Sequence, residues 1–335
     1  MKPRLHTALA LPLIALIAGC PGQVETPPDG APAHPVAEEH ALEGDWPRVF
    51  ANALGGEITL DRPPRRVVSL STGITETIFA LGAGDRLVGR LSLSTYPPEV
   101  LDVPEVGGLV DPSLEAIVAR EPDLVVTERG TPRDFIDAVE GVGIPVIAYD
   151  PTSIPEVISM IREVGRLLGV GAEAGELAGD LESRIATVKA RGDALGRGQG
   201  RPSALLLVAL DPVYAAGEGH FVDDMIYLAG GVNAGSLVPG SNAAQWPSLS
   251  MEAVVELDPD IVVIAMMHHE DWSTFDAGEE FRDRPGWKDL SATRGGRVYT
   301  IDPDLAVRAG PRLIDALEQM ADIIEDAVAG GRRNG

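Results

Sequence analysis

Short apolar runs without strict alternation recur along the chain, separated by segments in which apolar residues repeat every three or four positions. The run RRVVSL from Arg65 to Leu70, a run beginning at Leu87 and the run from Ile144 to Tyr149 predict strands. A strand whose consecutive residues are apolar is buried on both faces, as in a parallel sheet. Helical spacing from Ile74 to Leu81, ended by Gly82, separates the first two. This order of elements is typical of α/β folds.

An internal repeat divides the folded part into two halves. LEAIVAREPDLVV, which begins at Leu114, is similar to MEAVVELDPDIVV, which begins at Met251, at a constant offset of 137 positions. Each copy follows a serine suited to an N-cap and contains a short helix, a proline that ends it and a buried strand. We therefore expect an α/β fold of two related, Rossmann-like lobes with parallel-rich sheets.

Residues 152–198 predict a long helical connector between a lobe of residues 48–151 and a lobe of residues 199–330. The connector opens with a capping box at Ser153. Its apolar residues recur at helical spacing on both sides of Gly169. Because a helix rises about 1.5 Å per residue, the connector can cross the molecule. We expect a rigid rod, little hinge closure and a largely pre-formed cleft between the lobes.

The first 47 residues have the pattern of an export signal and a tether. Residues 1–19 join a basic start to an apolar run too short to span a bilayer. Ile17 to Cys20 resembles a bacterial lipobox, in which the cysteine is acylated, and Cys20 is the only cysteine. Residues 20–47 have too few large apolar residues to fold and predict a disordered tether. We expect an extracytoplasmic protein that Cys20 anchors through lipid to a bacterial cell membrane, whether inner or outer.

The acidic composition restricts the partners. The formal net charge is -24, with 51 acidic residues against 27 Lys and Arg. Such a surface repels the phosphate backbone, so we expect no nucleic-acid partner. The usual sequence signatures of ATPases, of serine hydrolases and of HExxH zinc proteins do not occur.

A metal site formed by His220, His268 and Glu270 is an alternative interpretation. His268 and Glu270 lie in the run His268-His269-Glu270, which follows a predicted strand. Neighbouring residues on an extended chain point to opposite sides, so these side chains do not easily share one metal. We favour histidines at the surface or the cleft rim. The alternative is a zinc-binding lipoprotein or a secreted metalloenzyme.

Three of the few aromatic residues lie in loops at strand or helix ends: Tyr96, Tyr214 and Trp246. Open α/β sheets bind ligands at such loops. Tyr and Trp there are suited to a large planar or apolar ligand. We predict that the three residues bind a ligand between the lobes. The alternative is that their rings cover the edge of the core.

Together these motifs resemble the substrate-binding proteins of ABC importers for cobalamin, haem and ferric siderophores, a class with a helical backbone between two lobes. The resemblance covers nearly all of Arg65 to Val328 and rests on RVVSLSTGITETIFALGAGDRLVG, LSTYPPEV, PSLEAIVAREPDLVV, SLSMEAVVELDPDIVV and RAGPRLI. It implies a receptor that delivers a corrinoid or an iron chelate to an importer permease. It implies neither an enzyme nor a resident cofactor or metal.

The resemblance also assigns residues to the permease contact. In that family a glutamate on each lobe docks into arginine pockets of the permease. The matching positions are Glu115 and Glu252, which the internal repeat pairs as well. An acid in the first turn of a helix also complements the helix dipole, which is the structural alternative for both.

For the cargo, the cobalamin-binding members match through YPP, W-P-x-x-S-x-E and R-A-x-P-R. Tyr214 and Trp246 keep an aromatic residue where those proteins stack the corrin. Aromatic positions are replaced by Leu93, Leu109 and Glu128. Glu128 and Arg308 would supply polar contacts. The choice among cobalamin, siderophore and haem stays open.

Overall fold

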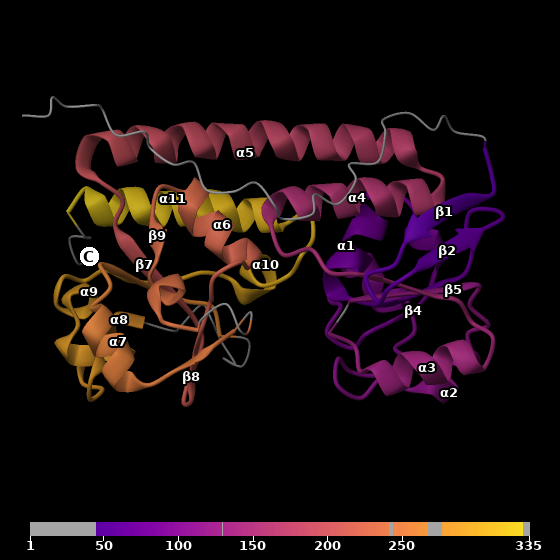
Figure 1. Ribbon diagram of the computed structural model, residues 1–335, viewed down its shortest axis with the longest axis horizontal. Helices are drawn as coiled ribbons and strands as arrows, with labels where there is room; N and C mark the ends of the chain where they lie inside the picture. The colour runs from indigo at the N-terminus through magenta and orange to yellow at the C-terminus, as the bar shows by residue number, and fades with distance from the viewer. Residues whose placement is uncertain (1–44, 129, 241–243, 245, 267–276, 331–335) are drawn as a thin grey trace, which may run out of the picture. The chain divides into compact units, whose positions relative to one another are not determined.

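Two α/β lobes carry most of the chain in the computed structural model (Figure 1), which describes residues 45–128, 130–240, 244, 246–266 and 277–330. The predicted signal and nearly all of the predicted tether, with Cys20, lie outside the described residues. His268 and Glu270 do so as well.

The first lobe contains a four-stranded parallel sheet in the order β4-β3-β5-β6, with a separate hairpin of β1 and β2. Its helices are α1, α2 and α3. The bounds are β1 (Arg48–Ala51), β2 (Glu57–Leu60), β3 (Val67–Leu70), α1 (Thr72–Ala80), β4 (Leu87–Arg90), α2 (Leu114–Val118), β5 (Leu124–Glu128), α3 (Arg133–Gly141) and β6 (Val146–Tyr149).

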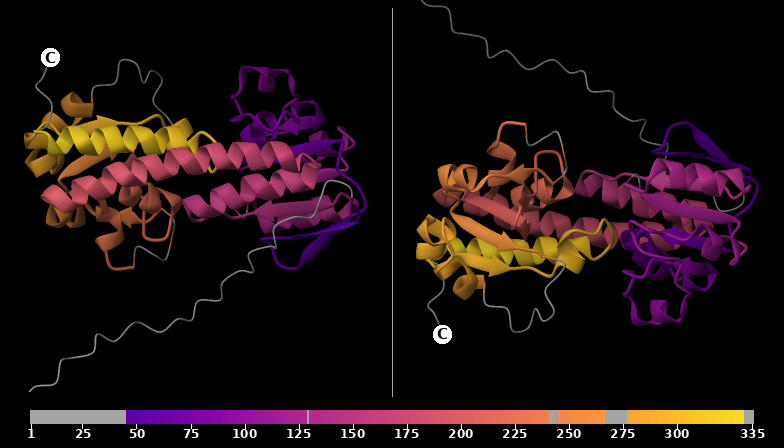
Figure 2. Two further views of the ribbon diagram at one scale, coloured as in Figure 1. Left: turned by 90° about the horizontal axis from the view of Figure 1, so that it is seen from above. Right: turned by 90° about the horizontal axis from the view of Figure 1, so that it is seen from below.

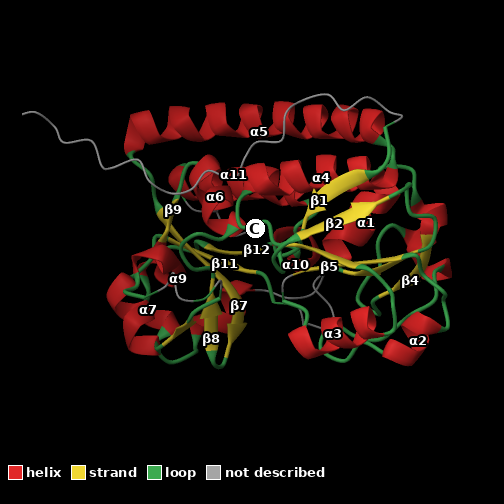
Figure 3. Cartoon of the chain, turned by 45° about the vertical axis from the view of Figure 1, so that its right-hand side comes forward, coloured by secondary structure: helices red, strands yellow, loops and turns green. Residues whose placement is uncertain are grey.

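The second lobe is built around β7, which pairs in parallel with β11 and β9, while β12 continues the sheet beyond β11 (Figure 3). The short β8 and β10 add an antiparallel edge. The bounds are β7 (Ser203–Leu210), β8 (Val213–Ala215), α6 (Phe221–Leu228), β9 (Val232–Asn233), β10 (Ser248–Leu249), α7 (Met251–Leu257), β11 (Ile261–Ile264), α8 (Ala277–Arg282), α9 (Ser291–Arg294), β12 (Val298–Thr300), α10 (Pro303–Ala306) and α11 (Leu313–Val328). The predicted fold class of two parallel-rich α/β lobes is confirmed.

The central strands are buried on both faces, as their continuous apolar runs predict. In β5, Leu124 and Val126 belong to one hydrophobic cluster, whereas Val125 between them belongs to another. In β11, Ile261 and Val263 join the same first cluster, and Val262 joins a third. The first cluster thus contains residues of both lobes, together with residues of the connecting helices.

The internal repeat is a structural repeat. The hydroxyls of Ser113 and Ser250 accept hydrogen bonds from backbone N–H groups and cap α2 and α7. Both helices are followed by a non-glycine residue with positive φ, Glu121 at 48° and Asp258 at 35°. The register also repeats, because Leu124 lies beside Val67 in β3 as Ile261 lies beside Ala204 in β7. The offset of 137 positions therefore also relates β3 to β7, which lie outside the two aligned stretches.

The connector is a helical hairpin rather than one rod. It consists of α4 (Ile154–Leu168) and α5 (Gly171–Gln199), and Gly169 ends α4 in the left-handed conformation at φ 68°. Both views in Figure 2 place α5 alongside α4 and α11. The sequence pattern predicted helices on both sides of Gly169 but not the reversal of chain direction between them. The spacing of apolar residues is the same whether Gly169 only interrupts one helix or ends it in the left-handed conformation. None of the described helices is both long and apolar enough to cross a membrane.

Both ends of α4 are bonded to different lobes. At its start, the backbone N–H of Ile154 donates to the Asp224 carboxylate on α6, at 3.0 Å. At its end, the Arg86 guanidinium of the first lobe donates to the carbonyl oxygen of Leu168. The hairpin therefore contacts both lobes.

Paired arginines join α5 to α11. The Arg184 guanidinium contacts the carboxylates of Asp315 and Glu318 at 2.6 and 2.7 Å. One heptad further along both helices, Arg191 contacts Asp322 and Glu325 at 2.6 and 2.8 Å. Because the residue numbers of both partners increase by seven from the first pairing to the second, α11 runs parallel to α5. We call these four contacts the arginine ladder.

Gly169→Ala tests the hairpin turn. A side chain at φ 68° is strained, and a Cβ would lie 3.0 Å from Pro63 Cγ. We expect the free energy of unfolding to fall by about 1–2 kcal/mol. Gly175→Ala is the control, because Gly175 lies inside α5 with no atom within 4 Å of a new Cβ, and it should be stabilising by about 0.5–1 kcal/mol. Urea denaturation measures the free energy of unfolding of both variants. An equal change in the two variants would contradict a left-handed turn at Gly169.

Candidate ligand site

The carboxyl end of the first-lobe sheet carries a buried polar group. Ser71 follows β3 and caps α1, its hydroxyl accepting from the Ile74 N–H at 3.1 Å and donating to Glu128. Burial raises the pKa of Glu128. Ser71 and the Arg308 guanidinium oppose that rise, whereas the Asp150 carboxylate adds to it. A carboxyl group that retains a proton can donate a hydrogen bond as well as accept one.

Arg308 approaches this group from the segment before α11. Its side chain is 7% exposed, and its guanidinium lies 3.5 Å from Oε1 of Glu76 on α1. The same guanidinium pairs with Asp304 of α10 at 2.5 Å. Two of the predicted polar residues, Glu128 and Arg308, come from different lobes, and the charge of Arg308 acts on the Glu128 carboxyl group.

Tyr96 contacts Arg312, which binds the same Glu76 carboxylate as Arg308 does. The Arg312 guanidinium carbon lies 3.8 Å from the centroid of the Tyr96 ring, a cation–π contact. Arg312 also donates two hydrogen bonds to Glu76, at 2.8 and 2.6 Å. Tyr96 remains 43% exposed.

A buried arginine holds the loop that carries Tyr96. Arg90 is 4% exposed and ends β4. Its guanidinium donates to the carbonyl oxygens of Leu91 and Val103 at 3.1 and 3.0 Å, and it contacts the Glu105 carboxylate at 3.2 Å. Both ends of the loop are therefore fixed to one side chain.

Tyr214 and Trp246 lie together on the second lobe. Tyr214 of β8 stands opposite Ser248 of β10, two residues after Trp246. Tyr214 is 37% exposed. The Trp246 ring is half-buried, with its centroid 4.6 Å from that of His220 and the two planes at 59°. Within the part of the chain that the structure describes, no hydrogen bond, ion pair or ring contact joins these aromatic residues to Tyr96.

His220 has a structural role that the sequence did not indicate. It caps α6, and its Nδ1 accepts a hydrogen bond from the Val222 N–H at 3.2 Å. It is 3% exposed, and burial lowers its pKa to about 4. No group of three His, Cys, Asp or Glu suited to a metal occurs among the described residues. The other two members of the predicted metal set, His268 and Glu270, lie outside them.

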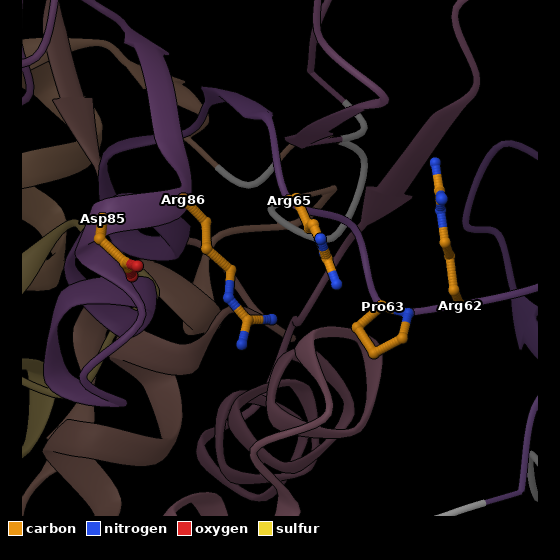
Figure 4. Close-up of a pocket in the computed structure, with 5 residues that line it drawn as sticks. All are labelled: Arg62, Pro63, Arg65, Asp85 and Arg86. Carbon is orange, nitrogen blue, oxygen red and sulfur yellow. The ribbon is translucent and has the colours of Figure 1, made fainter.

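None of the predicted ligand residues lines the pocket that contains three arginines. It has a volume of about 360 Å³ and is lined by Arg62, Pro63, Arg65, Asp85 and Arg86 (Figure 4). Arg86 is already bonded to Leu168 at the end of α4. A cation at a helix C-terminus stabilises the helix. The contacts of this pocket are therefore those of a helix cap beside the connector.

Glu115 and Glu252 occupy equivalent places on the two lobes. Each is the second residue of its short helix, two positions after the capping serine. Both side chains are exposed, and neither carboxylate has a hydrogen bond or an ion pair with the described residues. Within the described part of the chain, neither charge is therefore taken up by another side chain.

Sequence reasoning missed Glu76 and Arg312. Arg312 lies in the RAGPRLI motif, but the motif does not say what it contacts. Glu76 is the single acid in the apolar helix TGITETIFA, and it is 4% exposed. A lone acid among buried residues was the available signal, since charged side chains are rarely buried unless they are paired.

Comparison with known proteins identifies relatives over this whole region. The profile of the family described as "Periplasmic binding protein" matches residues 67–305. The uncharacterized ABC transporter substrate-binding lipoprotein YvrC of Bacillus subtilis is 30% identical over 331 residues, which cover 97% of this chain and 98% of that protein. The cobalamin-binding protein of Halobacterium salinarum is 29% identical over 308 residues, 89% of this chain and 80% of that protein.

A solved structure shares the fold and part of the sequence. The periplasmic heme-binding protein RhuT from Roseiflexus sp. RS-1, in its apo form, has a TM-score of 0.67 and 31% identity. The match covers 78% of this chain and 98% of that one. These relatives are solute-binding proteins, which favours the receptor interpretation over the zinc alternative.

His220→Asn tests the buried cap. In the unfolded state the histidine has a pKa near 6.5 and is protonated below that pH. In the folded state burial lowers the pKa of His220 to about 4, so it stays neutral down to that pH. The free energy of unfolding should therefore fall as the pH drops from about 6.5 to 4, by up to about 3 kcal/mol. Asparagine keeps the cap but cannot titrate. Urea denaturation across this pH range should show a smaller loss for the variant, and parallel curves would contradict the assignment.

Proposed function

This chain belongs to the periplasmic binding protein family, and from that premise we propose that it is the receptor of an ABC importer, which binds a corrinoid or an iron chelate outside the cytoplasm and presents it to the permease. In this role the chain catalyses no reaction. It holds the cargo and contacts the permease.

The observation that carries the proposal is the equivalent placement of Glu115 and Glu252. Two lobes that differ in their ligand-facing loops present an exposed carboxylate at the same point of the same repeated helix. A partner that touches both lobes at once would use both. Charge-assisted pairs with arginine suit such a contact, because they are directional and specific.

The cargo site we propose uses Tyr96, Tyr214 and Trp246 for stacking, with Glu128 and Arg308 as polar partners. The exposed faces of Tyr96 and Tyr214 suit a large, partly apolar molecule. The positive charges of Arg308 and Arg312 are balanced by Glu76 and Asp304. This balance suits a cargo without strong negative charge at that point and thus favours a corrinoid over a polyanionic chelate.

We also propose that Cys20 carries a lipid anchor. The lipobox-like residues up to Cys20 support this, as does the relative named as a lipoprotein. A membrane-bound receptor with a tether of 25 or more residues remains close to its permease while its lobes stay free to turn.

Cargo binding is tested with three probes: cyanocobalamin, haemin and ferric desferrioxamine. We expect one of them to bind in titration calorimetry. Trp246→Ala should weaken that binding more than tenfold, and Tyr214→Ala by about three- to tenfold, because an aromatic pair contributes about 0.5–1.5 kcal/mol beyond its buried area. Tyr227→Ala, on α6 and 56% exposed, is the control and should bind normally. Unchanged affinity in both site variants would remove this surface from the cargo site.

Permease docking is tested with the double variant Glu115→Gln, Glu252→Gln. It keeps size and helix capping but deletes the two charges, so it should fold and bind cargo normally. It should not stimulate ATP hydrolysis by the reconstituted importer. The control variant Glu99→Gln, Glu256→Gln removes the same charge from two other exposed positions and should stimulate as the parent does. Full stimulation by the first variant would leave both glutamates as helix-dipole partners only.

A further inference from the structure

The first turns of α1 lie directly against the segment that precedes α11. A Cβ on Gly73 would lie 2.2 Å from the backbone oxygen of Ala309. A Cβ on Gly310 would lie 2.9 Å from the backbone oxygen of Gly73. Only residues without a side chain allow this approach. The two backbones, one from each lobe, are therefore in contact at a pair of glycines.

Glu76 lies one turn after Gly73 on the same side of α1, as residues three apart in a helix do. Its carboxylate receives two hydrogen bonds from Arg312, at 2.8 and 2.6 Å, and its Oε1 lies 3.5 Å from the Arg308 guanidinium. The Glu76 side chain is 3% exposed. One carboxylate of the first lobe thus holds two arginines of the segment before α11.

The charges in this group are compensated only when the lobes are together. If the segment moved away, the Glu76 carboxylate would lose both arginines and would be solvated by water instead. Arg308 would keep only Asp304. Opening would break the two hydrogen bonds from Arg312 to Glu76, which are charge-assisted and directional. Removing one partner by mutation while the lobes stay together would instead leave the other charge desolvated.

The Glu76 carboxylate supports two of the proposed cargo residues. It contacts Arg308 directly. It also binds Arg312, whose guanidinium carbon lies 3.8 Å from the centroid of the Tyr96 ring. We propose that Glu76 is a positioning residue, which clamps the two lobes at the cargo site and sets the orientation of Arg308 and, through Arg312, of Tyr96. The effect on cargo rests on the proposed function, whereas the clamp itself does not.

The clamp is tested without any cargo by distances between the lobes. Cys20→Ser removes the only cysteine. Spin labels can then be attached in the full-length chain at Val142, after α3, and Val255, on α7, which are 53% and 45% exposed. We expect pulsed electron resonance to give one narrow distance distribution for this parent. Glu76→Gln should broaden it or add a longer distance.

Two further variants separate the clamp from general stability. Arg184→Gln breaks the arginine ladder between α5 and α11 and should destabilise the protein without changing the distance between the lobes. Arg312→Gln is milder than Glu76→Gln, because it leaves Glu76 with Arg308, and it serves if Glu76→Gln does not fold. A narrow, unchanged distribution in whichever of the two clamp variants folds would overturn the clamp.

Positioning is tested by a double-mutant cycle with the probe that binds the parent. Glu76→Gln and Tyr96→Leu should each weaken binding, by about tenfold and by about three- to tenfold. The double variant should lose less than the product of the two, because they disturb the same contact. Multiplicative losses would overturn the positioning role. If no probe binds the parent, the cargo proposal fails, while the distance measurements still decide the clamp.

Discussion

One hydrophobic core shared by both lobes determines how this molecule is organised. Alternate residues of the central strands, such as Leu124 in β5 and Ile261 in β11, enter the cluster that also contains residues of α4, α5 and α11. The residues between them fill a smaller core that belongs to one lobe only. Moving the lobes apart would expose the shared cluster to water, which is unfavourable in proportion to the apolar area. The ligand-facing loops are therefore attached to a frame that resists opening, and Glu76 adds a polar contact beside the glycine pair where the backbones of the two lobes touch.

The sequence predicted those parts of the fold that follow from local patterns. Continuous apolar runs identified the parallel strands, because a strand buried on both faces has no polar face. The repeat from Leu114 and Met251 predicted two lobes of the same kind, with serine caps and a terminating proline, and both copies are built in this way. The pattern also placed Glu115 and Glu252 at equivalent exposed positions. Each of these features depends on residues within about a dozen positions of one another.

Features that depend on distant residues were not predictable in the same way. The reversal at Gly169 needed a backbone angle that spacing does not encode. The partners of Glu76 lie 232 and 236 positions further along the chain. Arg308, Arg312 and Tyr96 are linked through Glu76, and the charge of Arg308 acts on Glu128, whereas the Trp246 ring lies against His220 on the second lobe. His220 was considered as a metal ligand because a histidine gives no sign in the sequence that it caps a helix.

The position of α11 at the end of the chain has a consequence for export. If the chain crosses a membrane unfolded and N-terminus first, the first lobe emerges before the segments that complete its contacts. Residues 308–312 and α11 arrive last, yet they contact α1 and α5 and complete the shared cluster. Until then the surfaces of α5 and α6 that pack on α11 lack that cover, although α1, α4 and α5 already pack on one another. A chain cut before α11 would therefore leave part of the shared cluster exposed to water.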